Sequence, residues 1–116
     1  MAIPKDSTLS IPQSSDYNLV VYCLDDEENP VDITGYSAEF TIKRTYQSSA
    51  SIITATSETG EIVITGLEGK LTISLTHTLT VDLPDFLCVY DLILTTPDSQ
   101  KLMLLRGKVQ VLLAVT

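Results

Sequence analysis

Short runs of alternating apolar and polar residues, separated by turn-forming residues, recur along most of this chain. Residues 36–44 show the pattern clearly, because Ala38, Phe40 and Ile42 occupy alternate positions. Alternation with a period of two predicts a strand with one buried face and one face in solvent. Turn signals recur at intervals of about 8 to 12 residues, a spacing typical of an all-β sandwich or small barrel. The length of 116 residues supports one core of this kind but not two domains.

The predicted fold is an all-β, immunoglobulin-like antiparallel β-sandwich of about seven or eight strands with one short helix. The helix candidate spans residues 76–83, where the threonine content and Pro84 allow one or two turns. The sequence lacks the antibody hallmarks, because it has no Trp and its two Cys do not bracket one. The expected strands span residues 17–24, 36–44, 51–56, 61–65, 71–75, 86–95 and 101–116, the last as one strand or two with Gly107 at a bulge or bend.

One core between two sheets is expected to hold the inward-facing residues of these strands. They are Ala38, Phe40, Ile42, Leu71, Ile73, Leu75, Tyr90 and Leu92. The strand at residues 17–24 differs from the others, because it is apolar at both sets of alternate positions. This pattern fits a strand that is buried on both sides or that lies at a subunit contact.

Residues 1–15 are rich in Ser and Pro and carry Ile3, Leu9 and Ile11 at a spacing too irregular for a helix face. They are predicted to form an extended N-terminal arm, and residues 16–116 are predicted to form the single β-sandwich domain. An arm of this composition frays unless something holds it. Either the domain itself or a neighbouring subunit is expected to do so.

The charge of the chain argues against a nucleic-acid partner. Fifteen Asp and Glu against seven Lys and Arg give a formal net charge of −8, which repels phosphate. The first residues contain no apolar stretch long enough for a signal-peptide core, so synthesis in the cytosol is expected. The apolar tract at residues 102–115 is interrupted by Arg106, Lys108 and Gln110, so no membrane span and no membrane partner are expected.

No residue pattern predicts catalysis, a cofactor or a metal site. His77 is the single imidazole, and the sequence around it lacks a nucleophile elbow. The acidic run 25–28 with Asp32 lacks the alternating spacing of a calcium loop, which favours a solvated turn. Asp91, within an apolar strand, needs a partner, and Arg106 or Lys108 would be a suitable one.

Cys23 and Cys88 sit in apolar alternating stretches and are expected to be buried free thiols. A disulfide is the second possibility. A metal site is a distant third, because two Cys and one remote His lack the paired spacing of zinc ligands.

Several short motifs follow one another along the chain. They are D-I-T-G at Asp32, Ile33, Thr34 and Gly35, a strand ending in Lys43 and Arg44, a glycine-led hairpin at 69–75, a T-x-x-L-P-like helix at 78–84, Y-D-L at Tyr90, Asp91 and Leu92, and L-x-G-x-V-x-V at 105–111. Their order resembles that in small virion proteins of tailed bacteriophages, including the N-terminal domains of baseplate upper proteins (BppU-like). The resemblance covers roughly residues 17–116.

The resemblance implies a non-enzymatic β-sandwich located in the virion tail or baseplate and made in the cytoplasm of the host bacterium. It implies a tail, baseplate or tail-fibre-attachment adaptor protein whose partners are other virion proteins and copies of itself. A capsid or neck decoration protein is the alternative within structural roles. A carbohydrate-binding module is the alternative of another class, and it would need an aromatic platform, for which Tyr36 and Tyr46 are the candidates.

Contacts to other subunits are expected at the arm and at strand edges, because exposed edges must be covered or paired. The residues predicted to make these contacts are Ile3, Leu9, Ile11, Tyr17, Leu19, Leu112 and Val115.

Overall fold

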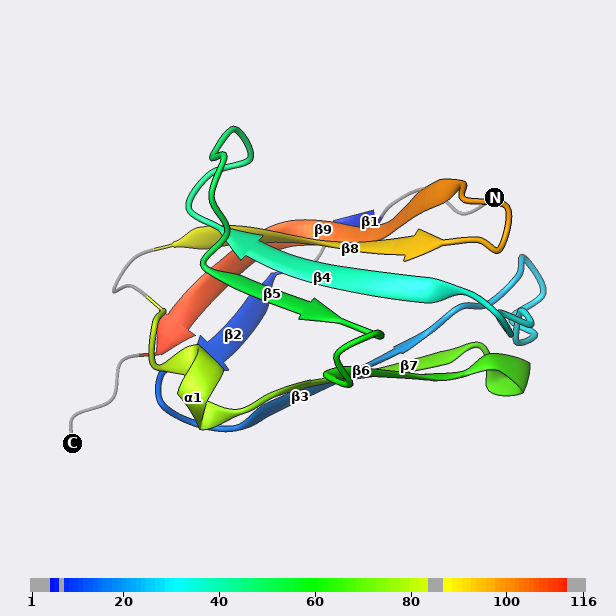
Figure 1. The fold of residues 1–116 in the computed structure, drawn as a ribbon, viewed down its shortest axis with the longest axis horizontal. Helices are drawn as coiled ribbons and strands as arrows, with labels where there is room; N and C mark the ends of the chain where they lie inside the picture. The colour runs from blue at the N-terminus through cyan, green and yellow to red at the C-terminus, as the bar shows by residue number, and fades with distance from the viewer. Residues whose placement is uncertain (1–4, 7, 84–86, 113–116) are drawn as a thin grey trace.

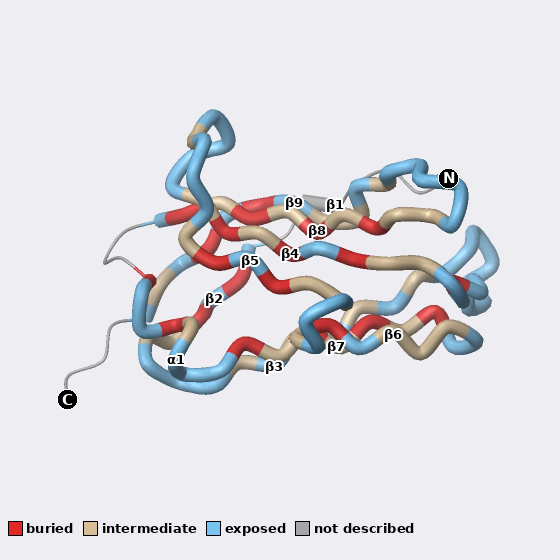
Figure 2. The backbone as a smooth tube through the Cα atoms, viewed as in Figure 1, coloured by how far each residue is buried: buried red, intermediate tan, exposed pale blue. Residues whose placement is uncertain are grey.

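Alternation of buried and exposed side chains along the strands divides the chain into two facing β-sheets (Figures 1 and 2). The computed structural model describes residues 5–6, 8–83 and 87–112. The six-stranded sheet contains β1 (Lys5–Asp6), β2 (Leu9–Pro12), β4 (Ser37–Lys43), β5 (Ile53–Thr56), β8 (Cys88–Thr95) and β9 (Lys101–Leu112). The three-stranded sheet contains β3 (Tyr17–Tyr22), β6 (Ile62–Thr65) and β7 (Lys70–Leu75). A 3-10 turn, η1 (Gly66–Glu68), and one helix, α1 (His77–Thr80), complete the described elements.

The strand order confirms the prediction of an all-β chain in two sheets and corrects its antiparallel character. The six-stranded sheet runs β1-β9-β8-β4-β5, with β2 also paired to β9, and the three-stranded sheet runs β3-β7-β6. Both β1 and β2 pair with β9 in parallel, so the larger sheet is mixed. The two extra strands arise because the predicted arm runs alongside β9 in the same direction.

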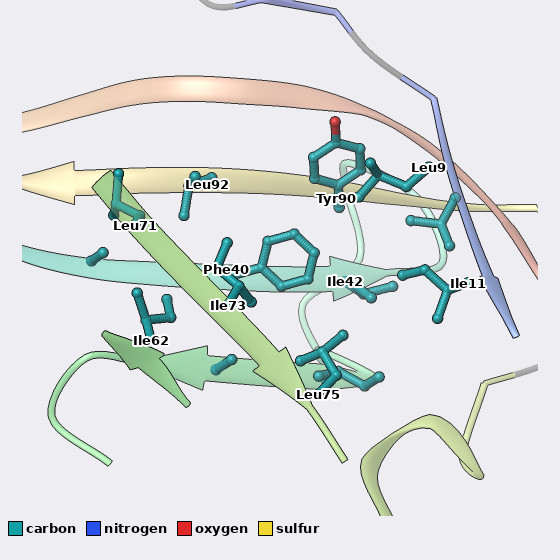
Figure 3. Close-up of a cluster of buried hydrophobic side chains, with 14 of the residues drawn as sticks. Leu9, Ile11, Phe40, Ile42, Ile62, Leu71, Ile73, Leu75, Tyr90 and Leu92 are labelled. Atoms are coloured by element: carbon teal, nitrogen blue, oxygen red, sulfur yellow. The ribbon is translucent and has the colours of Figure 1, made fainter. Parts of the chain in front are cut away.

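The core lies between the sheets, and all eight residues predicted for it are buried. The Phe40 and Tyr90 rings, from neighbouring strands of the six-stranded sheet, lie 5.6 Å apart at 35°. Figure 3 shows Leu71, Ile73 and Leu75 of β7 facing this pair from the other sheet. Inward positions of β8 are buried throughout, as the alternation from Cys88 to Leu94 predicts.

The described part of the predicted arm belongs to the six-stranded sheet. Residues 9–12 pair with Val109–Leu112 of β9, and the Gln13 N–H donates to the Leu112 carbonyl oxygen at 2.8 Å. Leu9 and Ile11 point into the core, where Ile11 is 0% exposed (Figure 3). The chain therefore holds this segment itself.

Helix α1 forms the crossing from β7 in one sheet to β8 in the other, and it confirms the one-turn helix expected within residues 76–83. The buried Thr80 hydroxyl accepts a hydrogen bond from the Ser15 N–H at 3.0 Å and donates one to the Ser15 carbonyl oxygen at 2.7 Å. The Asp16 carboxylate accepts the His77 N–H at 2.7 Å, which satisfies a donor at the start of the helix. These bonds fix the connection between β2 and β3.

We expect Asp16→Asn to reduce the pH dependence of stability at acid pH. Hydrogen bonds from the His77 backbone and then from its ring lower the pKa of the Asp16 carboxyl. A lowered pKa contributes stability that is present above the unfolded pKa and is lost as pH falls through the folded pKa. Thermal unfolding between about pH 7 and pH 2 should therefore show a shallower acid decline in the variant. Asp26→Asn, in an exposed turn, is the matched control, and an equal change in both variants would contradict the assignment.

The D-I-T-G motif forms a turn that is hydrogen-bonded to the neighbouring turn at one end of the sandwich. Asp32 Oδ1 accepts hydrogen bonds from the Thr34 N–H at 3.0 Å and the Thr34 hydroxyl at 2.6 Å, and these bonds lower the pKa of the Asp32 carboxyl. The Ile33 side chain is buried, and its N–H donates to the Gly66 carbonyl oxygen at 2.9 Å. The motif thus joins the β3–β4 connection to the turn between β6 and β7.

Both cysteines are free thiols, as predicted. Cys88 is buried, whereas Cys23 is only half-buried, in contrast to the expected burial of both. Burial raises the pKa of the Cys23 thiol. Burial also raises the pKa of Cys88, and the nearby Arg44 charge opposes that rise.

The bulge in β9 lies at Leu104 and not at Gly107, where a bulge or bend was expected. The β8–β9 register shifts between Leu92 and Ile93, which pair with Leu105 and Met103, so Leu104 is the extra residue. Gly107 itself keeps the regular register opposite Tyr90.

Candidate interaction surfaces

The outward face of the three-stranded sheet carries large apolar side chains in solvent. Val20 of β3 and Val63 of β6 flank Thr72 of β7 in one cross-strand row. Their exposed fractions are 45% for Val20 and 57% for Val63. Tyr22, 55% exposed, lies one row further along β3, opposite Lys70. We call Val20, Tyr22, Val63 and Thr72 the apolar face.

The apolar side chains continue past the end of this sheet. Leu24 and Val31 are exposed on either side of the acidic connection, and Leu67 in η1 is 79% exposed. The turn around Gly69 brings these segments together, because the Cys23 N–H donates to the Gly69 carbonyl oxygen and the Val31 N–H donates to the Cys23 carbonyl oxygen. A cluster of exposed apolar side chains of this kind is typical of a protein interaction site.

The outward face of the six-stranded sheet has a different character, because it is mostly polar and cationic. In the register of β4, β8 and β9, Lys43 lies in one row with Val89 and Lys108. The next row holds Thr41, Asp91 and Arg106.

The β4–β5 loop folds onto this face through Tyr46. The Tyr46 hydroxyl donates to the Gly107 carbonyl oxygen at 3.2 Å, and the Arg106 guanidinium lies 5.3 Å from the centre of the Tyr46 ring. Beneath the loop is a recess of about 30 Å³ lined by Thr41, Lys43, Tyr46, Val89, Tyr90 and Asp91. A recess of this volume admits water but not a sugar ring.

Asp91, singled out by its apolar surroundings, lies half-buried in the row between Thr41 and Arg106. Burial raises the pKa of its carboxyl, the Lys43 charge lowers it, and the Glu39 charge raises it again. Arg106 was one of the two partners expected for Asp91, and the strand register places these residues side by side.

The predicted contact residues separate into three groups. Ile3 and Val115 lie outside the described residues. Leu9 and Ile11 are core residues rather than subunit contacts, because a side chain buried inside its own chain presents no surface to another. Tyr17 and Leu19 are half-buried on the inner side of β3, and Leu112 is 47% exposed at the end of β9.

Val20, Tyr22 and Val63 were missed as candidate contact residues. The signal for Val20 and Tyr22 was the doubly apolar pattern of β3, in which Tyr17, Leu19 and Val21 face the core and the alternate positions face solvent. For Val63, alternation within a four-residue strand is too short to distinguish the inward face from the outward face.

The described residues were also examined for a metal site and for a membrane-spanning helix. Within residues 5–6, 8–83 and 87–112, no three His, Cys, Asp or Glu side chains gather in a way that could hold a metal ion. Among the helices of that same part of the chain, none is long and apolar enough to cross a membrane. No protein-family model and no curated protein matches this chain.

Proposed function

We propose that this protein is a structural component of a tailed-bacteriophage virion, a tail, baseplate or fibre-attachment protein that acts through protein–protein contacts. The observation that carries the proposal is the apolar face of the three-stranded sheet. Two valines and a tyrosine stand about half exposed on a regular sheet surface, where solvent-facing positions are usually polar. The order of motifs from the D-I-T-G turn to the last strand supports the same role.

The finer fold that accompanies this proposal is the immunoglobulin-like sandwich. Three features support it. The first segment pairs in parallel with the last described strand, the chain alternates between two facing sheets, and α1 carries it from β7 to β8 across the sandwich. In such a fold the loops and outward sheet faces are available for contacts while the core stays the same.

The direct test is to tag the chain at its C-terminal end in the phage that encodes it and to purify the particles. We expect the tag to sediment with intact virions and gold-labelled antibody to mark the tail. Label on the head or neck would favour the decoration-protein alternative. A tag found only in the unassembled fraction would contradict a virion role.

A matched pair of variants connects this test to the apolar face. Val20→Thr with Val63→Thr keeps β-forming side chains but removes apolar surface, and we expect about tenfold or greater loss of the tagged chain from particles. Val81→Thr, at an equally exposed residue beside α1, should assemble normally. Equal incorporation of all three proteins would show that the apolar face is not the docking surface.

A further inference from the structure

One edge of the three-stranded sheet is open along β3. This strand pairs with β7 on one side, and no other described strand pairs with it. Along an antiparallel pair, residues whose N–H and C=O groups face the partner alternate with residues whose groups face away. The Cys23 N–H donates to the Gly69 carbonyl oxygen one position beyond the Tyr22–Lys70 pair, so this bond fixes the phase of the alternation along β3.

Alternate residues of β3 therefore direct both backbone groups to the open edge. They are Asn18, Val20 and Tyr22. A second bond gives the same phase, because the Ser74 N–H, opposite Asn18, donates to Glu61 on the β6 side and not to β3. Within the part of the chain that the structure describes, the outward N–H and C=O groups of these three residues have no hydrogen-bond partner.

The side chains of β3 show the same open edge. Those that face the core are only half-buried, and they are Tyr17, Leu19 and Val21. On the central strand β7, the side chains that face the core, Leu71, Ile73 and Leu75, are at most 1% exposed. The difference arises because an edge strand has a neighbour on one flank only. A strand added at this edge would cover the second flank.

Among the described edge strands, β3 is the least protected against pairing. Proteins blunt sheet edges with short strands, charged side chains or proline. β3 has six residues, none of them charged and none of them proline. By contrast, β5 and β6 have four residues each, β1 is a charged pair of residues, and β2 ends in Pro12. The β5 edge is also partly occupied, because the Thr56 N–H donates to Glu61 Oε1 at 3.2 Å.

We propose that β3 pairs in antiparallel fashion with β3 of a second copy of this chain, about a two-fold axis at Val20. This register places Val20 opposite Val20 of the second copy and Asn18 opposite Tyr22. Every outward N–H and C=O group of both strands then has a partner, because the three outward residues are evenly spaced about Val20. The two small sheets become one sheet with the order β6-β7-β3-β3-β7-β6.

The side chains favour the same occupant. On the core side, Leu19 would lie opposite Val21 of the second copy, and each would cover the exposed flank of the other. On the outward side, Val20 would contact its own counterpart. The chain carries a net charge of −8, but no charged side chain lies within β3, so this pairing brings no like charges together along the strand.

The inference goes beyond the proposed function, because it describes the purified chain and holds whatever particle contains it. A two-fold contact uses the same surface on both copies and therefore closes as a dimer. Val63 of β6 lies two strands away from the contact and stays exposed. The dimer would thus join the apolar faces of two copies into one larger surface.

Opposite charges introduced at one position test the two-fold register. Because Val20 faces itself across the axis, Val20→Lys and Val20→Glu each place like charges opposite one another, whereas a mixture of the two variants places opposite charges there. We expect each variant alone to lose at least about tenfold in self-affinity and an equimolar mixture to recover association. Val63→Lys and Val63→Glu are the matched controls and should associate like the wild type, because Val63 is similarly exposed on the same sheet face but belongs to β6.

Sedimentation velocity as a function of concentration measures the association, with circular dichroism to confirm that each variant is folded. We expect the wild-type chain to form a reversible dimer. The dimer should persist as NaCl rises from about 0.1 M to 0.5 M, because salt screens the repulsion between two chains of charge −8 and leaves the backbone hydrogen bonds in place.

Amide hydrogen exchange followed by NMR locates the contact. The N–H groups of Asn18, Val20 and Tyr22 should exchange slowly in the dimer and rapidly after dilution to the monomer. Thr54 of β5 provides the control amide. Its N–H faces away from β4, since the Ser57 N–H, three positions along, donates to Ala38 of β4, and it should exchange rapidly at both concentrations.

A wild-type chain that stays monomeric at about 1 mM would overturn the proposal. A mixture of the two Val20 variants that fails to associate would also overturn it. Val63 variants that weaken association equally would place the second copy on the apolar face instead, and slow exchange of the Val20 N–H in the monomer would show that the chain covers its own edge. The virion-labelling experiment measures incorporation and not self-association, so the two proposals can fail separately.

Discussion

Replacing Ile11 with alanine is expected to lower the free energy of unfolding by about 2–5 kcal/mol, the range for removing a fully buried aliphatic side chain. Ile11 is 0% exposed and belongs to β2, a strand held at the sheet edge by β9. The loss combines the apolar transfer free energy of the deleted carbons with the cavity that they leave. Urea or thermal denaturation of the two proteins measures it.

Leu112→Ala is the matched control, because Leu112 lies at the β9 end of the same strand pair but is 47% exposed. We expect a change of less than about 0.5 kcal/mol for a surface position of this kind. Deletion of residues 1–15 should be at least as destabilising as Ile11→Ala, since it removes β2 entirely. A truncated chain with wild-type stability would show that β2 is an accessory segment and that Leu9 and Ile11 are dispensable to the core.

Gly69→Ala is expected to destabilise the fold by about 2–5 kcal/mol, through backbone strain and crowding together. Gly69 has a φ of +62°, a left-handed conformation that an L side chain adopts at a cost. A Cβ at this position would lie 2.7 Å from the carbonyl oxygens of Cys23 and Val31. The Cys23 carbonyl oxygen accepts the Val31 N–H, and the Cys23 N–H donates to the Gly69 carbonyl oxygen, so a shift of this backbone would disturb these hydrogen bonds.

Gly60→Ala separates the two contributions. Gly60 also has a positive φ, +93°, but a Cβ there would have no neighbour within 4 Å. It should therefore show only the conformational cost, about 1–2 kcal/mol. Equal destabilisation by the two substitutions would mean that crowding at Gly69 is relieved at no cost and that the turn is more adaptable than its contacts indicate.

Period-two alternation predicted most of the core, because Phe40 and Ile42 alternate with polar neighbours along β4 and Leu92 follows the same period in the more apolar β8. It failed at the N-terminal segment, where only β2, four residues long, carries the inward pair Leu9 and Ile11. A pattern so short is indistinguishable from that of an extended arm. The parallel pairing of β2 with β9 could not be predicted from local sequence either, because no turn or crossover element links these two strands directly.

The candidate surfaces were less predictable than the core. Apolar residues at both faces of β3 indicated either double burial or a subunit contact, and only the sheet order shows which positions point outward. The row that Lys43 and Lys108 share could not be predicted from the sequence, because these residues are far apart along the chain and are aligned only through the β4–β8–β9 register. Local features, by contrast, gave the D-I-T-G turn and the one-turn helix, because hydrogen bonds between near neighbours define them.

The pairing of β2 with β9 also has a consequence for how fast the chain can fold. Leu9 pairs with Val109, so this contact closes a loop that contains nearly the whole chain. Loop closure of that length is entropically expensive, and β-rich chains dominated by non-local pairing fold in milliseconds to seconds. Until β9 is in place, Leu9 and Ile11 have no strand to hold them and stay exposed. Until β2 pairs with β9, this edge of the sheet is unpaired, and a strand of a neighbouring chain can pair with it instead.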